Sequence, residues 1–242
     1  MAFLLKPLLL VLATTPLLAA AGPSCQLTDP GLTLQSYQAD PQRERIAMYW
    51  QQPNGKDYGS LRALLGAING DGRVRMAMNG GIYDKAYAPL GLYIENGQQK
   101  VAVNRASGGG NFFIKPGGVF YLRGHQAGIV SLDKLKSTAG MDYAVQSGPM
   151  LIENGTINWR LKPSASSRKL RNGVGITKQG KVVFMLSDRE TNFYDFACYA
   201  KTRLNVRQML YLDGTISKMY LQGGSIPWQY HPFVSMITVE KR

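Results

Sequence analysis

Several short segments of the chain alternate apolar and polar side chains, which is the pattern of β-strands that bury one face. Residues 45–50 place Ile46, Met48 and Trp50 on one side, and residues 73–78 repeat the pattern. Shorter apolar runs bounded by turn residues indicate further strands. These are predicted at residues 92–94, 100–103, 150–152, 171–176, 208–212, 218–221 and 233–239.

Two segments follow the helical period instead. Apolar residues recur at helical spacing over residues 61–68, directly after Ser60, whose hydroxyl suits a helix N-cap. A second helix is predicted over residues 192–204, and it carries Cys198. Its apolar stripe consists of Phe193, Phe196, Ala197, Ala200 and Leu204.

Turn residues punctuate the predicted strands. Asn96-Gly97 and Asn154-Gly155 predict two tight hairpins, because Asn and Gly adopt the positive φ angles that such turns need. Further hairpins are predicted at residues 116–118 and 179–180. Strands dominate without a regular βαβ alternation. We therefore predict a single α+β domain over residues 22–242, with largely antiparallel β-sheets and a few flanking helices.

The composition narrows the function classes. With 45% hydrophobic residues the 242-residue chain should fold, and 27 Gly with 12 Pro argue against a helical bundle. Two His and two Cys exclude a zinc site of four cysteines or three histidines. Catalysis by a Ser-His-Asp triad would depend on His125 or His231, which we interpret as structural. We predict neither a metal nor another cofactor.

The first residues have the character of an export signal. Residues 1–21 combine Lys6, an apolar stretch and a small-residue end at Ala19-Ala20-Ala21, which predicts a secretory signal peptide. An uncleaved anchor is the alternative, but the stretch is shorter than a bilayer requires. We expect a periplasmic or secreted protein with no stable membrane span after cleavage.

Export changes the interpretation of the two cysteines. In an oxidising compartment Cys25 and Cys198 are predicted to form a disulfide. The rival interpretation is a lipid anchor on Cys25, although Gly22-Pro23-Ser24 is a poor signal for one.

The formal net charge of +13 favours an anionic partner. In a cell envelope that partner is a phosphorylated glycan, a lipid headgroup or a surface polymer rather than a nucleic acid. Because the Lys and Arg residues are scattered, the charge is also compatible with a role in solubility alone.

Candidate chemistry lies where strands stop at glycine. Asn79-Gly80-Gly81 and Ser147-Gly148-Pro149 each end a predicted strand and expose backbone groups. Arg171 begins a strand, and Asp213-Gly214 ends one, with Ser217 four residues after Asp213. Taken alone, the segments at Asn79, Ser147 and Asp213 are more typical of ordinary turns than of a site.

In this order the segments resemble the phosphodiester glycosidase family, whose best-known member uncovers mannose 6-phosphate on lysosomal hydrolases. The resemblance spans residues 70–240 and is closest to compact bacterial members. Where the family often reads Asp-Gly-Gly-Gly-Ser, this chain has the bulkier Thr215 and Ile216, which favours a different sugar. Asn172-Gly173 likewise replaces Thr-Ala. Further matching residues are Tyr83, Pro89-Leu90-Gly91-Leu92, Asn154-Gly155, Val174-Gly175, Ser187-Asp188-Arg189 and Leu212.

The resemblance implies an exported hydrolase that cleaves the glycosidic bond of a sugar 1-phosphodiester. Asp213 is then the carboxylate at the anomeric centre, as nucleophile or as base for water, with Asp188 as second choice. Arg171 would clamp the phosphate. Substrate-orienting roles fall to Asn79, Gly80, Gly81, Ser147, Gly148 and Ser217.

Two other function classes remain open from the sequence. A metal-dependent phosphodiesterase would break the phosphorus–oxygen bond. A non-catalytic module would bind anionic glycans through its basic surface, with Trp159 and Trp228 stacking on sugars. Arg160 and Lys162 lie beside Trp159 and would serve either hypothesis.

Overall fold

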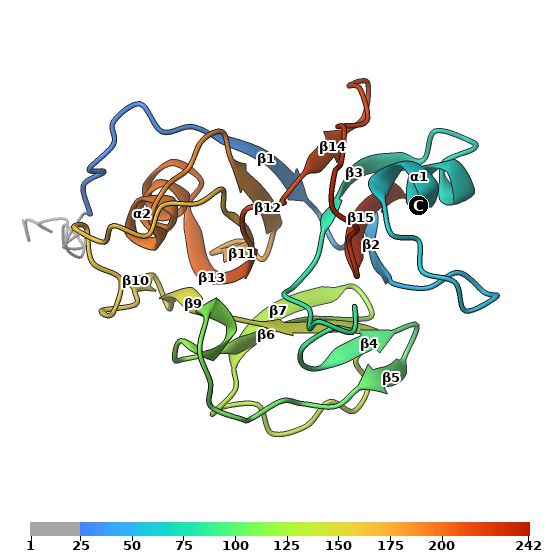
Figure 1. The fold of residues 1–242 in the computed structure, drawn as a ribbon, viewed down its shortest axis with the longest axis horizontal. Helices are drawn as coiled ribbons and strands as arrows, with labels where there is room; N and C mark the ends of the chain where they lie inside the picture. Colours follow the sequence, from blue (N-terminus) through green and yellow to red (C-terminus); the bar gives the residue numbers. More distant parts are fainter. Residues whose placement is uncertain (1–24) are drawn as a thin grey trace, which may run out of the picture.

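The computed structural model describes residues 25–242, so the predicted signal peptide lies outside the described residues. Three β-sheets surround a common core, and α1 and α2 cover two of them (Figure 1). Every pairing between the described strands is antiparallel. The predicted α+β class with largely antiparallel sheets is confirmed. No α-helix of the described residues has both the length and the apolar character needed to cross a membrane.

The first sheet carries α2 (Phe193–Arg203) on one face. Phe196, Ala197 and Ala200 of this helix pack against Met209 and Tyr211 of the sheet. The predicted helix over residues 192–204 is therefore confirmed. In spatial order the strands are β1 (Leu34–Ala39), β12 (Val182–Ser187), β11 (Asn172–Thr177), β13 (Val206–Asp213), β9 (Met150–Glu153) and β10 (Thr156–Ile157).

The second sheet is covered by α1 (Leu61–Ile68), which begins where Ser60 accepts a hydrogen bond from the Ala63 N–H at 3.1 Å. Its strands are β14 (Met219–Leu221), β3 (Val74–Asn79), β15 (Met236–Lys241) and β2 (Glu44–Tyr49). The third sheet contains β5 (Gln98–Val101), β4 (Tyr93–Glu95), β8 (Tyr143–Ser147), β6 (Gly118–Arg123) and β7 (Gln126–Ser131), and a 3₁₀ turn, η1 (Asn111–Phe113), precedes β6.

One apolar core joins all three sheets. Met78 of β3, Phe120 of β6 and Phe184 of β12 belong to the same buried cluster. The rings of Phe120 and Phe184 meet edge to face with centroids 6.0 Å apart. Because each sheet buries its inner face against the other two, the described residues form a single domain.

The local turn signals were mostly correct. Asn96 and Gly97 have φ of 51° and 75°, and Asn154 and Gly155 repeat the geometry between β9 and β10. The hairpin at residues 179–180 is also confirmed, between β11 and β12. The hairpin predicted at residues 116–118 is wrong, because the chain enters β6 from η1 rather than from a strand.

Cys25 and Cys198 form a disulfide, with their Cα atoms 5.7 Å apart. The same N-terminal arm is held by the Asp195 carboxylate, which accepts hydrogen bonds from the Thr28 N–H at 2.8 Å and the Thr28 hydroxyl at 2.5 Å. The disulfide uses the sulfur that a lipid anchor on Cys25 would need, so the two interpretations exclude each other.

Replacing both cysteines with serine is expected to lower the free energy of unfolding by roughly 2 to 5 kcal/mol, because the bridge closes a loop of 173 residues in the unfolded chain. Urea denaturation of the double variant measures the loss, and the reduced wild-type protein should match it. Two free thiols in denatured, unreduced protein purified from an oxidising compartment would contradict the bridge.

Candidate functional site

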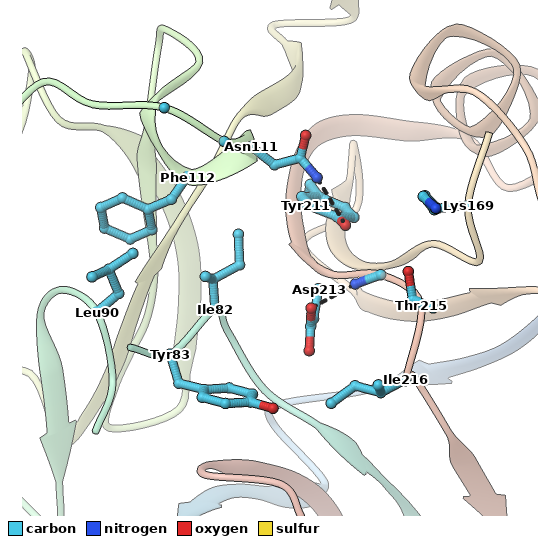
Figure 2. A pocket seen from close by; sticks show the side chains of 13 residues that line it. Ile82, Tyr83, Leu90, Asn111, Phe112, Lys169, Tyr211, Asp213, Thr215 and Ile216 are labelled. Atoms are coloured by element: carbon cyan, nitrogen blue, oxygen red, sulfur yellow. Dashed lines mark hydrogen bonds between the residues drawn. The ribbon is translucent and has the colours of Figure 1, made fainter. Parts of the chain in front are cut away.

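A cavity of about 400 Å³ opens where the ends of β3 and β13 meet the segment around η1 (Figure 2). Three parts of the chain, together with Leu90 and Lys169, form its walls. The principal lining residues are Ile82 and Tyr83 after β3, Asn111 and Phe112 in η1, Tyr211, Asp213, Thr215 and Ile216 around the end of β13, and Lys169.

Asp213 is the last residue of β13, and it brings the one carboxylate in this lining. Its Oδ1 accepts a hydrogen bond from the Gly214 N–H at 2.7 Å, and its Oδ2 accepts one from Asn79 Nδ2 at 3.3 Å. Carboxylate oxygens have further acceptor capacity. The remaining lone pairs are available to a ligand in the cavity.

Hydrogen bonds fix the side-chain amides of Asn79 and Asn172, and one of these bonds joins two sheets. Asn79 Oδ1 accepts from the Lys218 N–H at 3.1 Å, which turns Asn79 Nδ2 toward Asp213. Asn172 Oδ1 accepts from the Asp213 N–H at 2.6 Å, so Asn172 Nδ2 donates to the Asn79 carbonyl at 3.0 Å. Backbone donors therefore assign both amides, and β3 is connected to β13 through Asn172.

Burial raises the pKa of Asp213 from 3.8 to about 6, and the hydrogen bonds from Gly214 and Asn79 limit the rise. At neutral pH the carboxylate is mostly ionised, yet it is a far better proton acceptor than an exposed aspartate. A pKa near the working pH is what a general base requires.

Arg171 lies behind the cavity wall rather than in it. Its side chain is fully buried, with Nε donating to the Thr191 carbonyl at 3.1 Å and Nη2 donating to the Ser167 carbonyl at 2.9 Å. The guanidinium lies 4.0 Å from the centre of the Phe193 ring. These contacts leave Arg171 one route to the cavity, through Nη1, which donates to the Tyr211 hydroxyl at 3.4 Å.

The Tyr211 hydroxyl connects Arg171 to the cavity. It accepts a hydrogen bond from Arg171 Nη1 at 3.4 Å. It accepts another from Asn111 Nδ2 at 3.5 Å, which Figure 2 shows. A phenol oxygen has two acceptor sites and one proton to donate. Burial raises the pKa of Tyr211, so the proton stays bound at neutral pH. With both acceptor sites used, that proton is free for a ligand in the cavity.

Two further side chains shape the cavity. Lys169 is exposed at its margin, and no ion pair of the described residues involves this ammonium group. The Tyr83 ring stacks on Tyr87 at a centroid distance of 5.7 Å and an interplanar angle of 20°. Tyr83 therefore presents a flat aromatic wall, and Lys169 presents a positive charge.

The glycines predicted to bind substrate serve close packing. The Gly80 N–H donates to the Ser235 carbonyl at 2.8 Å, so it is not directed at a ligand. A Cβ at Gly81 would lie 2.9 Å from Val145 Cγ2, and one at Gly148 would lie 2.7 Å from the Phe112 carbonyl oxygen. Only glycine fits at Gly81 and Gly148, because the backbone there packs directly against the segments that contain Val145 and Phe112.

The other predicted site residues divide into two groups. Ser217 is buried, with Oγ 3.5 Å from Asn79 Nδ2, and Ser147 Oγ donates to the Leu212 carbonyl at 2.9 Å; both support the network around Asp213. Asp188 is outside the cavity lining and accepts hydrogen bonds from the Thr33 N–H at 3.2 Å and the Thr33 hydroxyl at 2.8 Å. Its position is that of an anchor for β1.

Lys169, Asn111 and Tyr211 were missed by sequence reasoning. Tyr211 had a signal, because it precedes Asp213 by two positions on one strand, and such residues share a face. The other two had none. Among residues 25–242, no group of three or more His, Cys, Asp or Glu side chains is placed to hold a metal ion.

Comparisons with known proteins give consistent results. A family model described as phosphodiester glycosidase matches residues 72–239. The chain is 63% identical over 238 residues to the uncharacterized protein YigE of Escherichia coli (strain K12), covering 98% of this chain and 94% of that one.

Solved structures share the fold at low sequence identity. The catalytic domain of zebrafish N-acetylglucosamine-1-phosphodiester alpha-N-acetylglucosaminidase, auto-inhibited by its pro-peptide, aligns with a TM-score of 0.59 at 17% identity, over 90% of this chain and 86% of that one. A putative exported protein from Burkholderia pseudomallei K96243 aligns with a TM-score of 0.58 at 10% identity, over 86% and 73% of the two chains.

Proposed function

The chain belongs to the phosphodiester glycosidase family, and on that premise we propose that it hydrolyses the glycosidic bond of a sugar 1-phosphodiester. The observation that carries the proposal is the cavity in which the Asp213 carboxylate shares one lining with the Lys169 ammonium and the Tyr211 hydroxyl. A carboxylate suits a cationic anomeric centre, and the two donors suit a phosphate.

The leaving group explains why one carboxylate suffices. Ordinary glycosidases use a second carboxyl group to protonate an alkoxide as it departs. A phosphate monoester is already a weak base, so it needs charge stabilisation more than a proton. Lys169 supplies a positive charge and Tyr211 supplies a hydrogen bond. Arg171 acts through Tyr211 as a positioning residue instead of clamping the phosphate directly.

Asp213 activates the attack at the anomeric carbon. As a base it takes a proton from water while the water oxygen bonds to the anomeric carbon. The bond from that carbon to the phosphate oxygen breaks, and its electron pair stays on the phosphate. As a nucleophile it forms a glycosyl ester that water then hydrolyses. The anomeric configuration of the first product separates these routes, because one displacement inverts it and two retain it.

The sugar is selected by the side chains around Asp213. Tyr83 provides an apolar wall on which a sugar ring can stack. Thr215 and Ile216 stand in the lining where the family often has glycine. Because their side chains take up space there, we propose a sugar other than the N-acetylglucosamine in the name of the zebrafish enzyme.

We propose that the protein acts in the periplasm or outside the cell, on an envelope or extracellular glycan. The disulfide is consistent with an oxidising compartment. One similar structure is that of a protein described as exported. The signal peptide over residues 1–21 stays a prediction, and cell fractionation with N-terminal sequencing of the purified protein tests it.

Hydrolysis in heavy-oxygen water tests which bond breaks. With a sugar 1-phosphodiester as substrate, the label is expected in the reducing sugar, because water attacks the anomeric carbon. The phosphate monoester should carry none, and mass spectrometry of both products measures this. Label in the phosphate, or activity lost with EDTA and restored by a divalent ion, would instead indicate a metal-dependent phosphodiesterase.

A further inference from the structure

Trp159 is a large apolar side chain left in solvent. It is 71% exposed and stands in the loop after β10. Two surface hollows of about 440 and 380 Å³ share Trp159 and Pro116 as lining residues. An aromatic ring standing between two hollows is placed to contact a ligand that runs through both.

The larger hollow is positively charged. Arg105, Lys115 and Arg160 line it together with one acidic residue, Asp133. The Arg160 guanidinium lies 4.5 Å from the centre of the Trp159 ring. Arg105 Nη1 donates to the Leu132 carbonyl at 2.8 Å, which holds that guanidinium in place. Charge complementarity therefore favours an anionic ligand.

The hollow and the cavity that contains Asp213 are lined by neighbouring residues of one chain segment. Arg105 and Lys115 line the hollow, whereas residues 109–112 between them line the cavity that contains Asp213. One short segment thus contributes to both places. A glycan chain with one bond at Asp213 would therefore extend past this segment to reach Trp159.

We propose that Trp159, Arg160, Arg105 and Lys115 form a distal glycan site, which binds an anionic, phosphorylated glycan chain away from the bond that is cleaved. The choice of a phosphorylated glycan rests on the proposed function. A lipid headgroup shares the anionic chemistry, but the three cations line one hollow and Trp159 also lines a second, an arrangement that suits an extended chain.

Trp228 offers a matched control. It is 73% exposed, its ring packs on Tyr230 at 5.7 Å, and no cation–π contact of the described residues involves it. Removing either tryptophan takes an exposed indole from the surface. A specific effect at Trp159 is therefore separable from a general loss of aromatic surface.

The test measures binding to phosphomannan, with neutral mannan and phosphatidylglycerol vesicles as further arms, in an Asp213→Asn background that prevents turnover. Trp159→Ala and Arg160→Ala are each expected to weaken phosphomannan binding by roughly tenfold, and Trp228→Ala to leave it unchanged. With Asp213 intact, turnover of a small sugar 1-phosphodiester should be equal in all three variants.

The proposed distal glycan site would be refuted if the protein did not bind phosphomannan, or if Trp159→Ala bound it as tightly as its parent. It would also be refuted if Trp228→Ala lost as much affinity as Trp159→Ala. Tight binding of neutral mannan would refute the anionic class, and a loss confined to the vesicles would assign the surface to lipid. These binding arms do not depend on turnover. The binding results can therefore be interpreted even if the protein does not hydrolyse sugar 1-phosphodiesters.

Discussion

Replacing Asp213 with asparagine is expected to reduce kcat by a factor on the order of 10³ to 10⁴, because the variant has no carboxylate to accept a proton or attack the sugar. Asparagine has nearly the same shape, and its Oδ1 can still accept from the Gly214 N–H. Its Nδ2 then faces Asn79 Nδ2, a local donor–donor contact that should lower stability without preventing folding. Rates with a sugar 1-phosphodiester measure the loss, and circular dichroism checks the fold.

Asp188→Asn is the matched control. It makes the same chemical change at the other carboxylate considered from the sequence, which lies outside the cavity and bonds to Thr33. Its kcat should stay within about threefold of wild type. A severe loss in Asp188→Asn together with an active Asp213→Asn would transfer the catalytic role to Asp188.

The pH profile follows from the same group. Because burial raises the pKa of Asp213 to about 6 and the ionised form is the active one, kcat/KM should rise with pH and level off above about 7. Asp213→Asn should remove that rise from its residual activity. A rate that falls above pH 6 would show that the protonated carboxyl acts as an acid.

The contribution of Asp213 to the free energy of unfolding should fall with rising pH, whereas kcat/KM should rise. A carboxyl whose pKa is higher in the folded than in the unfolded state binds its proton more tightly when folded. The contribution of Asp213 to the free energy of unfolding therefore decreases as pH rises from about 4 to about 6, and stays low above. Comparing urea denaturation of wild type and Asp213→Asn across that range isolates it.

Arg171→Ala is expected to lower the free energy of unfolding by about 3 to 5 kcal/mol. The change removes the donor of the Ser167 carbonyl and one of two donors of the Thr191 carbonyl, and it opens a cavity beside Phe193. Urea denaturation measures the loss. An unfolding free energy within 1 kcal/mol of wild type would contradict the buried network.

Tyr211→Phe separates catalysis from folding at the same place. It removes the hydroxyl that faces the cavity and keeps the ring against Phe193, so kcat should fall by a factor on the order of 10² with a small change in stability. If Arg171 acts through this hydroxyl, Arg171→Lys should reduce kcat in wild type and have little further effect in Tyr211→Phe. Additive losses would contradict the positioning role.

The sequence predicted best what depends on neighbours along the chain. Periodicity within a few residues predicts the strands that contain Met48 and Met76 and the helix that follows Ser60. Turn chemistry predicts the two Asn-Gly hairpins. The same local logic drew attention to Asp213, because a polar residue ending an apolar strand stands out.

The rest of the candidate site depends on register and tertiary packing. Asn172 pairs with Asp213 through the alignment of β11 on β13, which includes a register shift that no local pattern announces. Asn111 and Lys169 come from segments that meet only when the sheets assemble. Arg171 follows an exposed stretch at residues 162–169, yet it directly precedes β11, an interior strand, and its guanidinium is carried inward to the Tyr211 hydroxyl.

The fixed amides of Asn79 and Asn172 have a consequence for the proposed reaction. Both are oriented by backbone N–H groups, so the polar environment of the carboxylate is preorganised before any ligand arrives. Little reorganisation energy is then required at Asp213 during the reaction. Residues 109–110 and Thr215 line the same cavity outside this network, so adjustment to a substrate would fall to them.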